Sequence, residues 1–230
     1  MKQYDYFGDR VTFLDKLRMK ASLTIRRQIY DWFCQQLGTI SGRTILDMGS
    51  TPDTEHLDSN CFIRWLLADK ATVLATSPED ISDLETVFPG VKTIAFPPQR
   101  HRLGSIDAVI SSAVIEHTGS RSSQIQHIAS LLELAPTVLV TTPNRYHWLD
   151  FHTKLPLLHW LPRSLHRRLL RGVGMEFWSR EENLNLLSET DLREIVAAAL
   201  PKPTAYRVEW YRPQFLGRVS NLVVLIRERS

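Results

Sequence analysis

The sequence predicts an α/β protein built on a doubly wound, mostly parallel β-sheet. Apolar runs of strand length alternate with stretches of helix length over residues 44–141, and this alternation is typical of parallel βαβ units. Three of the apolar runs end in small polar residues or glycine. Because ligands of open α/β sheets bind outside the carboxyl ends of the strands, these endings indicate a small-molecule site at one edge of the sheet.

The elements of the first half of the chain follow from their apolar pattern and from the residues that begin or end them. The first helix has its apolar residues roughly on one side and ends at Gly38. Ser77 and Pro78, followed by two acids, make a favourable helix start. In chain order we expect a helix over residues 12–37, a strand over 44–50, a helix over about 61–69, a strand over 71–75, a helix from Ser77 to the residue before Pro89, and a strand over 91–96.

The second half of the chain continues this alternation and then breaks it. Pro156 and Pro162 divide the segment after the fifth strand into short helices. Ser188 precedes Asp191 at the spacing of a helix N-terminal cap. Two late strands have no helix-length segment between them, so we expect an antiparallel pair at the sheet edge. The expected elements are a strand over 106–110, a helix over 122–134, a strand over 137–144, a helical insert over about 146–180, a helix over 188–200, and strands over 206–211 and 222–226.

Size and composition narrow the class of protein. The chain has 230 residues, a hydrophobic fraction of 43% and a charged fraction of 23%, which are ordinary values for a soluble globular protein. A net charge of +3 is too small to indicate a nucleic-acid partner. Cys34 and Cys61 show no metal or disulfide spacing, which favours reduced thiols in a cytoplasmic protein. Neither a signal peptide nor a membrane-spanning segment is expected, and no oligomeric state follows from the sequence.

Three motifs occur in order along the chain. They are TILDMGS at residues 44–50, SIDAVISSAVIEH at residues 105–117, and TTPNRYHWLDFHTKLPLLHWLP at residues 141–162. Together they resemble the class I S-adenosylmethionine-dependent methyltransferases, particularly bacterial members of the type 11 group. The resemblance covers roughly residues 40–200. It implies a Rossmann-like methyltransferase domain over residues 41–230, an N-terminal helical extension over residues 1–40, and S-adenosylmethionine as the cofactor.

The resemblance also implies roles for residues at the strand ends. Methyl transfer to a hydroxyl needs a base, and histidine is the commonest base near neutral pH, so His117 and His152 are the candidate catalytic residues. Glu116 and Asn144 are the candidate substrate-binding residues. A helix cap or backbone hydrogen bonds for Glu116 and His117, an interior position for His152, and a simple turn for Asn144 remain open as structural alternatives. The candidate cofactor-binding residues are Asp47, Gly49, Ser50, Thr51, Glu79, Ser112 and Ala113.

The chain departs from the family at three cofactor contacts. Thr51 and Asp53 stand where the family usually has glycines, which let the backbone approach the cofactor closely. The second strand ends at residues 75–77 without the usual acid, so that Glu79 or Asp80 would have to replace it. The third strand is followed by Phe-Pro-Pro instead of an aspartate near the adenine. These departures keep a second class open, a catalytically inactive methyltransferase-fold protein that binds a partner or a membrane.

The expected function is O-methylation of a small-molecule acceptor, including glycolipid or saccharide types. The insert combines Leu, Trp and Arg over residues 155–174, and such a segment either covers the active site or makes peripheral contact with a membrane. We expect no metal dependence, because no carboxylate–histidine cluster shows ligand spacing along the chain. A nicotinamide oxidoreductase is disfavoured, because no GxGxxG opens the first helix of the sheet.

Overall fold

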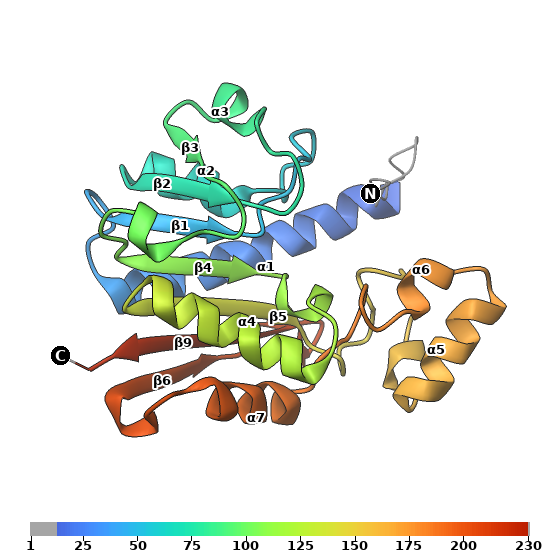
Figure 1. The fold of residues 1–230 in the computed structure, drawn as a ribbon. Helices are drawn as coiled ribbons and strands as arrows, with labels where there is room; N and C mark the ends of the chain where they lie inside the picture. Colours follow the sequence, from blue (N-terminus) through green and yellow to red (C-terminus); the bar gives the residue numbers. More distant parts are fainter. Residues whose placement is uncertain (1–12, 230) are drawn as a thin grey trace.

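A seven-stranded β-sheet forms the centre of the molecule (Figure 1). The computed structural model describes residues 13–229, with side chains from residue 18 onward. From one edge to the other the sheet contains β3 (Val91–Thr93), β2 (Thr72–Thr76), β1 (Thr44–Met48), β4 (Ala108–Ser112), β5 (Thr137–Pro143), β9 (Asn221–Glu228) and β6 (Tyr206–Tyr211). The first five of these strands pair in parallel, and β9 runs antiparallel to both of its neighbours. The prediction of a mostly parallel sheet with an antiparallel pair at one edge is therefore confirmed.

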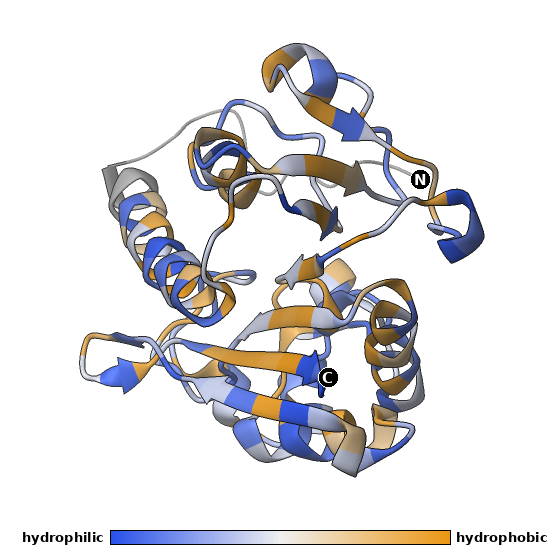
Figure 2. Cartoon of the chain, turned by 90° about the vertical axis from the view of Figure 1, so that its left-hand side faces the viewer, coloured by the Kyte–Doolittle hydropathy of each residue, from blue (hydrophilic) through white to orange (hydrophobic). Residues whose placement is uncertain are grey.

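Helices cover both faces of the sheet, and each face has its own hydrophobic core (Figure 2). Side chains of neighbouring strand residues enter opposite cores, as Ile45 and Leu46 of β1 do, because successive side chains of a strand point to opposite faces. Both residues are fully buried, which is typical of a parallel sheet covered on two sides. One core includes α1 (Phe13–Leu37), α2 (Cys61–Ala68) and α3 (Leu84–Val87), and the other includes α4 (Arg121–Leu134) and α7 (Glu189–Ala199).

The long helix α1 packs against the sheet and its neighbours. Ile29 is fully buried. The hydroxyl of Tyr30 donates a hydrogen bond of 2.6 Å to the carboxylate of Asp69, the residue that caps the end of α2. Trp32 stacks on Tyr211 of β6, with the ring centroids 5.2 Å apart. The N-terminal helix therefore shares a hydrophobic core with the rest of the chain.

The insert after β5 projects beyond the carboxyl ends of the parallel strands (Figure 1). Leu170, Trp178 and Leu184 are buried in a small hydrophobic cluster of its own. Within residues 13–229, no helix has both the length and the apolar character needed to cross a membrane. The remaining elements are η1 (Arg100–Arg102), η2 (Ile115–His117), η3 (Leu158–Trp160), α5 (Arg163–Gly172), α6 (Glu176–Ser179), η4 (Pro203–Ala205) and a hairpin of β7 (Gln214–Phe215) and β8 (Arg218–Val219).

Two predicted helix starts had different outcomes. Ser188 caps α7 in a capping box with Asp191, as expected. The prediction of a helix starting at Ser77 is wrong, because the only helix in that segment is the single turn α3. The hydroxyl of Ser77 accepts a hydrogen bond from the N–H of Glu79, and the carboxylate of Asp80 accepts one from the N–H of Ser82. These local turns use the same short polar side chains as a helix cap and compete with the helix.

His127 of α4 provides a test of the packing between this helix and the sheet. Burial lowers the pKa of His127 from 6.5 to about 4, and its Nε2 lies 2.9 Å from the hydroxyl of Ser111 in β4. The unfolded chain therefore binds a proton below about pH 6.5, whereas the folded protein does so only near pH 4. The free energy of unfolding should fall as the pH drops through this window. Glutamine does not titrate. Between pH 7 and pH 5 the free energy of unfolding of His127→Gln should therefore fall by about 2 kcal/mol less than that of the wild type.

Denaturant unfolding of both proteins at pH 7 and pH 5 measures this difference. The comparison cancels the contributions of the other titrating groups, because they are shared by the two proteins. The same pH dependence in both proteins would show that the imidazole is protonated as easily in the folded protein as in the unfolded chain.

Candidate active site

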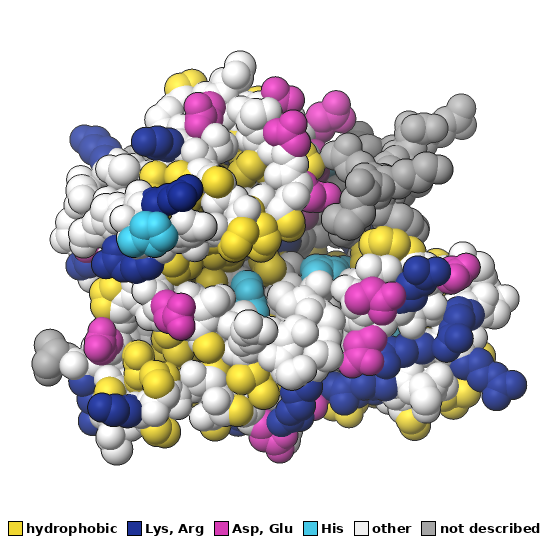
Figure 3. Space-filling view, viewed as in Figure 1, with side chains coloured by type: hydrophobic (Ala, Val, Ile, Leu, Met, Phe, Trp, Pro, Cys, Tyr) yellow, Lys and Arg dark blue, Asp and Glu magenta, His cyan; other side chains and the backbone are white. Residues whose placement is uncertain are grey.

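The carboxyl ends of β1, β4 and β5 meet at the edge of the sheet next to the insert (Figure 1). Asp47 of β1 lies opposite Ile110 of β4, and Ser112 of β4 lies opposite Thr141 of β5. This parallel register brings the ends of the three strands side by side. Figure 3 shows a concentration of Lys and Arg side chains over the insert. The strand ends that carry the sequence motifs therefore contribute to one site.

The turn after β1 is tight and largely buried. Gly49 has a φ of 92°, and a Cβ at this position would lie 2.4 Å from a methyl carbon of Val114, so glycine is required. The hydroxyl of Ser50 donates a hydrogen bond of 2.6 Å to the carboxylate of Asp47. Burial raises the pKa of Asp47 to about 6, although this hydrogen bond and the charge of Arg26 oppose the shift. Three of the predicted cofactor-binding residues thus form one compact turn.

The loop that follows this turn is held by polar side chains instead of glycines. The amide group of Asn60 accepts a hydrogen bond from the N–H of Thr51 and donates to the carbonyls of Thr51 and Asp53. The carboxylate of Asp53 accepts hydrogen bonds from the N–H groups of Glu55 and His56. The hydroxyl of Thr51 accepts one from the N–H of Asp53. The departure from the family's glycine pattern therefore produces a defined loop conformation.

The backbone turns sharply at the end of β4. Ala113 has a φ of 57°, and its N–H donates a hydrogen bond of 2.9 Å to the carbonyl of Thr141. The hydroxyl of Ser112 lies 3.2 Å from the hydroxyl of Thr141. Non-glycine residues are uncommon in this left-handed region, and they concentrate at functional positions. The turn leads directly into η2, which carries Glu116 and His117.

Glu116, His117 and His152 form a cluster, named here the Glu–His–His cluster. The two imidazole ring centroids are 4.9 Å apart, and Nε2 of His152 lies 3.8 Å from Oε1 of Glu116. Glu116 is fully buried, and its Oε2 accepts a hydrogen bond of 2.8 Å from the hydroxyl of Thr142. Among the side chains that the structure describes, from residue 18 onward, its Oε1 has no hydrogen-bond partner. The structure therefore brings a carboxylate and two imidazoles together from segments that are distant in sequence, which spacing along the chain could not reveal.

Each imidazole of the cluster is oriented through its Nδ1 atom. Nδ1 of His117 lies 2.6 Å from the carbonyl oxygen of Asn183 and donates to it, since a carbonyl can only accept. Nδ1 of His152 lies 3.0 Å from the carboxylate of Asp150. These contacts fix both rings and leave their Nε2 atoms for the cluster.

The two histidines differ in their proton affinity. Burial and the nearby charge of His152 lower the pKa of His117. Burial also acts to lower the pKa of His152, but its hydrogen bond to Asp150 and the charges of Asp150 and Glu116 outweigh that effect, and the net pKa is raised. Burial acts to raise the pKa of Asp150, but the hydrogen bond and charge of His152 hold it well below its usual range. Near neutral pH, His117 is therefore the neutral histidine and the better proton acceptor.

Two other predicted site residues lie in less specific surroundings. Glu79 is exposed beyond the end of β2. The side chain of Asn144 donates a hydrogen bond to the carbonyl of Val219 and accepts one from the N–H of Tyr146. Both ends of this amide are bonded to the protein's own backbone, which favours a structural role over substrate binding. The functional roles assigned to Glu79 and Asn144 stay predictions.

Three residues that lie at the candidate site were not identified from the sequence. Arg26 of α1 lies close enough for its charge to act on both Asp47 and His152. The indole of Trp178 lies against His152, with the ring centroids 5.5 Å apart. Nothing in the sequence around Arg26 or Trp178 marks either residue as part of a site, because arginines are common on amphipathic helices and the insert has no periodic pattern. Asp150 did carry one, because an aspartate two residues before a candidate histidine is well placed to orient it.

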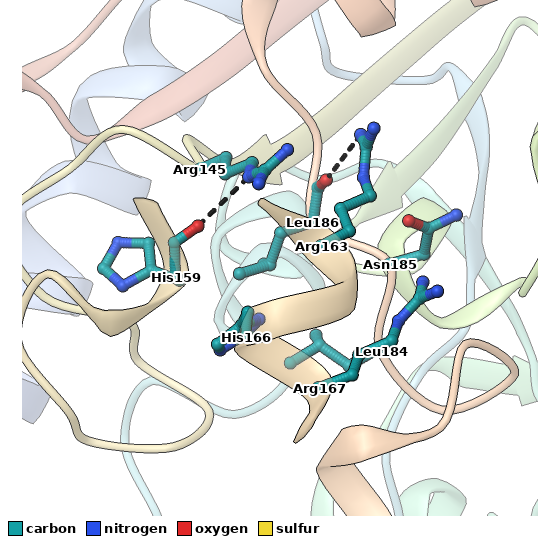
Figure 4. A pocket seen from close by; sticks show the side chains of 8 residues that line it. All are labelled: Arg145, His159, Arg163, His166, Arg167, Leu184, Asn185 and Leu186. Atoms are coloured by element: carbon teal, nitrogen blue, oxygen red, sulfur yellow. Dashed lines mark hydrogen bonds between the residues drawn. The ribbon is translucent and has the colours of Figure 1, made fainter. Parts of the chain in front are cut away.

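A separate small cavity lies beneath the insert (Figure 4). Its volume of about 10 Å³ is the space of a single water molecule, which rules it out as the site of an organic acceptor. Polar atoms of His159, Arg163, His166 and Asn185 are buried around it without a hydrogen-bond partner in the described part of the chain. The cavity is lined by Arg145, His159, Arg163, His166, Arg167, Leu184, Asn185 and Leu186.

Comparisons with known proteins identify the fold. No family model and no curated protein sequence matches the chain. Magnesium protoporphyrin IX methyltransferase from Synechocystis PCC 6803, solved with bound SAH, has a TM-score of 0.58 and 16% identity, over 97% of this chain and 91% of that one. An S-adenosylmethionine-dependent methyltransferase from Mesorhizobium loti has a TM-score of 0.53 and 15% identity, over 86% and 98% of the two chains. A putative S-adenosylmethionine-dependent methyltransferase from Listeria monocytogenes has a TM-score of 0.53 and 12% identity. The match covers 92% of this chain and 100% of that one. The chain therefore has the Rossmann-like class I methyltransferase fold that its sequence predicts.

Asp47→Asn tests the energetic cost of the buried carboxyl group in the turn after β1. In the folded protein the pKa of Asp47 is about 6, against 3.8 without burial. The folded protein therefore holds this proton more tightly, and the free energy of unfolding falls as the pH rises from about 4 to about 6. An amide does not ionise, so the variant should be more stable than the wild type at pH 8, by up to about 3 kcal/mol.

Denaturant unfolding at pH 8 and pH 4.5 provides the measurement. The difference between the two proteins should shrink at the lower pH, where the wild-type carboxyl group is protonated. A variant less stable than the wild type at pH 8 would show instead that the fold depends on the charge of Asp47.

Proposed function

We propose that this chain, which has the class I methyltransferase fold, is an S-adenosylmethionine-dependent methyltransferase. Its acceptor is a small molecule, of glycolipid or saccharide type, and the methyl group goes to an acceptor oxygen. The observation that carries the proposal is the position of the Gly49 turn and the Glu–His–His cluster at neighbouring strand ends, where ligands of this fold class bind. Burial of carboxylates and imidazoles costs free energy, and a site without function would have no reason to keep them.

The residues at the ends of β1 and β4 fit the cofactor. The turn at Gly49 leaves no room for a Cβ, so that only backbone lines this position. We assign Asp47 and Ser50 to the cofactor loop, and Ser112 and Ala113 to the opposite wall. Phe96, whose side chain is 49% exposed, offers an apolar surface for the adenine in place of the missing aspartate. When bound, the cofactor supplies a methyl group that its sulfonium has already activated.

The protein then has to align the acceptor and take its proton. His117 suits the second task, because its lowered pKa keeps it neutral and its Nδ1 is already used to hold the ring. His152, with its raised pKa, suits a hydrogen-bond donor to the acceptor oxygen. A hydroxyl acceptor has to lose its proton, so a neutral histidine at the site supports oxygen as the methylated atom.

The outer surface of α5 supports an acceptor met at a membrane. Leu165, Leu169 and Val173 are 43%, 39% and 63% exposed, and exposed Arg168 and Arg171 lie on the same short helix. Apolar side chains flanked by arginines suit the boundary between lipid headgroups and acyl chains. Peripheral contact of this kind would bring a glycolipid acceptor to the insert, which lies next to the site (Figure 1).

Calorimetric titration with S-adenosylhomocysteine tests the cofactor assignment. The wild type should show saturable binding at one site, and Asp47→Ala should weaken it at least tenfold, which corresponds to about 1.4 kcal/mol. Glu133→Ala removes an exposed carboxylate of α4 and serves as the control, with affinity unchanged. Gly49 is unsuitable for this test, because any side chain would clash with Val114 and disturb the loop itself. No heat at millimolar ligand with folded wild type would favour the catalytically inactive alternative.

His117→Gln tests the assignment of the base. Transfer of labelled methyl groups to a panel of saccharide and glycolipid acceptors should fall about 100-fold or more, whereas the affinity for S-adenosylhomocysteine should change little. His101→Gln, on exposed η1, is the matched control and should leave both quantities unchanged. An equal loss of turnover and affinity would assign His117 to cofactor binding instead.

A further inference from the structure

We propose that the Glu–His–His cluster is a binding site for a divalent transition-metal ion, with zinc as the ion that fits it best. The ligands would be Oε1 of Glu116 and one imidazole nitrogen each of His117 and His152. One ligand atom from each residue can be chosen so that all three lie within 4.8 Å of one another. The site requires no methyl donor, so it is independent of the proposed function.

The geometry of the cluster is close to that of a formed metal site. With metal–ligand bonds of about 2.1 Å, ligand atoms of a tetrahedral site are about 3.4 Å apart. Nε2 of His152 and Oε1 of Glu116 are 3.8 Å apart, so a small rotation of either side chain would bring both to a shared ion. At this separation they are too far apart to form a direct hydrogen bond. The spacing of these two atoms therefore suits a metal ion bound between them.

The surroundings of the two imidazoles are those that metal-binding histidines commonly have. Such a histidine usually donates its second ring nitrogen to a carboxylate or a backbone carbonyl, which fixes the tautomer and the ring orientation. Asp150 provides the carboxylate for His152, and the carbonyl of Asn183 provides the acceptor for His117. Thr142 holds the other oxygen of Glu116. All three proposed ligands are thus oriented by a second group.

The Oε1 atom of Glu116, which has an imidazole near it but no hydrogen bond, is an independent observation that points to a ligand. The side chain is fully buried, and its Oε1 has no hydrogen-bond partner among the side chains described from residue 18 onward. A buried carboxylate oxygen without a hydrogen bond is energetically unfavourable. A bound cation would remove this cost. The mixed ligand set of two imidazoles and one carboxylate suits zinc or another first-row transition metal better than magnesium or calcium, which prefer oxygen ligands.

Three protein ligands leave at least one coordination position open, as in catalytic zinc sites. If the acceptor binds there through a hydroxyl, the ion would lower the pKa of that hydroxyl. His117 would then serve as a ligand, and the metal would take over the activation of the acceptor. This consequence rests on the proposed function, whereas the metal site itself does not.

Cobalt and zinc binding to the full chain, freed of metal by a chelator and carrying no histidine tag, tests the site. The wild type should bind one equivalent of Co²⁺, with a visible absorption spectrum that zinc abolishes by competition. Glu116→Gln and His152→Asn should each weaken Co²⁺ binding by about 100-fold or more, and Asp150→Asn by about tenfold through the orientation of His152. His101→Asn is the control and should bind as the wild type does. Circular dichroism would establish that each variant is folded.

Each outcome of this experiment is decisive. Absence of Co²⁺ and Zn²⁺ binding by folded wild type at millimolar metal overturns the site. Retention of binding by both cluster variants, or its loss in the His101 control, places the metal elsewhere and also overturns the proposal. Glu116→Gln is nearly isosteric, so it keeps the test valid if His152→Asn does not fold. No methyl donor is present, so failure here is distinguishable from failure of cofactor binding.

Discussion

The fully buried carboxylate of Glu116 is the constraint around which this end of the molecule is organised. Removal of a carboxylate from water costs several kcal/mol unless charges and hydrogen bonds compensate. The compensation comes from two directions. Thr142 donates a hydrogen bond from β5, and His152 of the insert, whose pKa is raised in part by the charge of Glu116, lies 3.8 Å from the other carboxylate oxygen. The sheet and the insert therefore have to meet at Glu116. Movement of the insert away from the sheet would leave this charge without its partner.

Backbone contacts reinforce the same junction. The carbonyl of Glu116 accepts a hydrogen bond of 2.7 Å from the N–H of Asn185, and the carbonyl of Asn183 holds the ring of His117. The side chain of Gln124 in α4 bridges both segments, because it donates to the carbonyls of Ile115 and Asn185. The segment that leaves the insert is thus fixed to η2 before any ligand binds. An insert held in this way can orient the imidazoles of His117 and His152 as well as cover them.

The fold could be predicted from the sequence because its determinants are local and repetitive. Apolar strand runs, the cap at Ser188 and the glycine-bounded first helix each carry their own signal. The polar ends of β1 and β4 likewise placed Asp47 and Glu116 at one edge, since parallel register follows from the fold. The failed helix at Ser77 shows the limit of this approach, because a serine followed by acids also forms successive turns. The approach of His152 to Glu116 could not be predicted at all, because it depends on how an insert without periodicity packs on the sheet.

We propose that the altered loop after β1 is a retained ligand site and not a decayed one. Asp53 replaces a glycine, but it is joined to Asn60 in a network that fixes the loop. A loop released from selection would have no reason to acquire a replacement network. The same loop keeps Asp47 buried against Ser50, although burial raises the pKa of this carboxyl group to about 6 and so costs stability at neutral pH. The folded state gains no stability from an ionisable group at position 47. A bound ligand with hydrogen-bond donors would offset the free-energy cost of burying the Asp47 carboxylate.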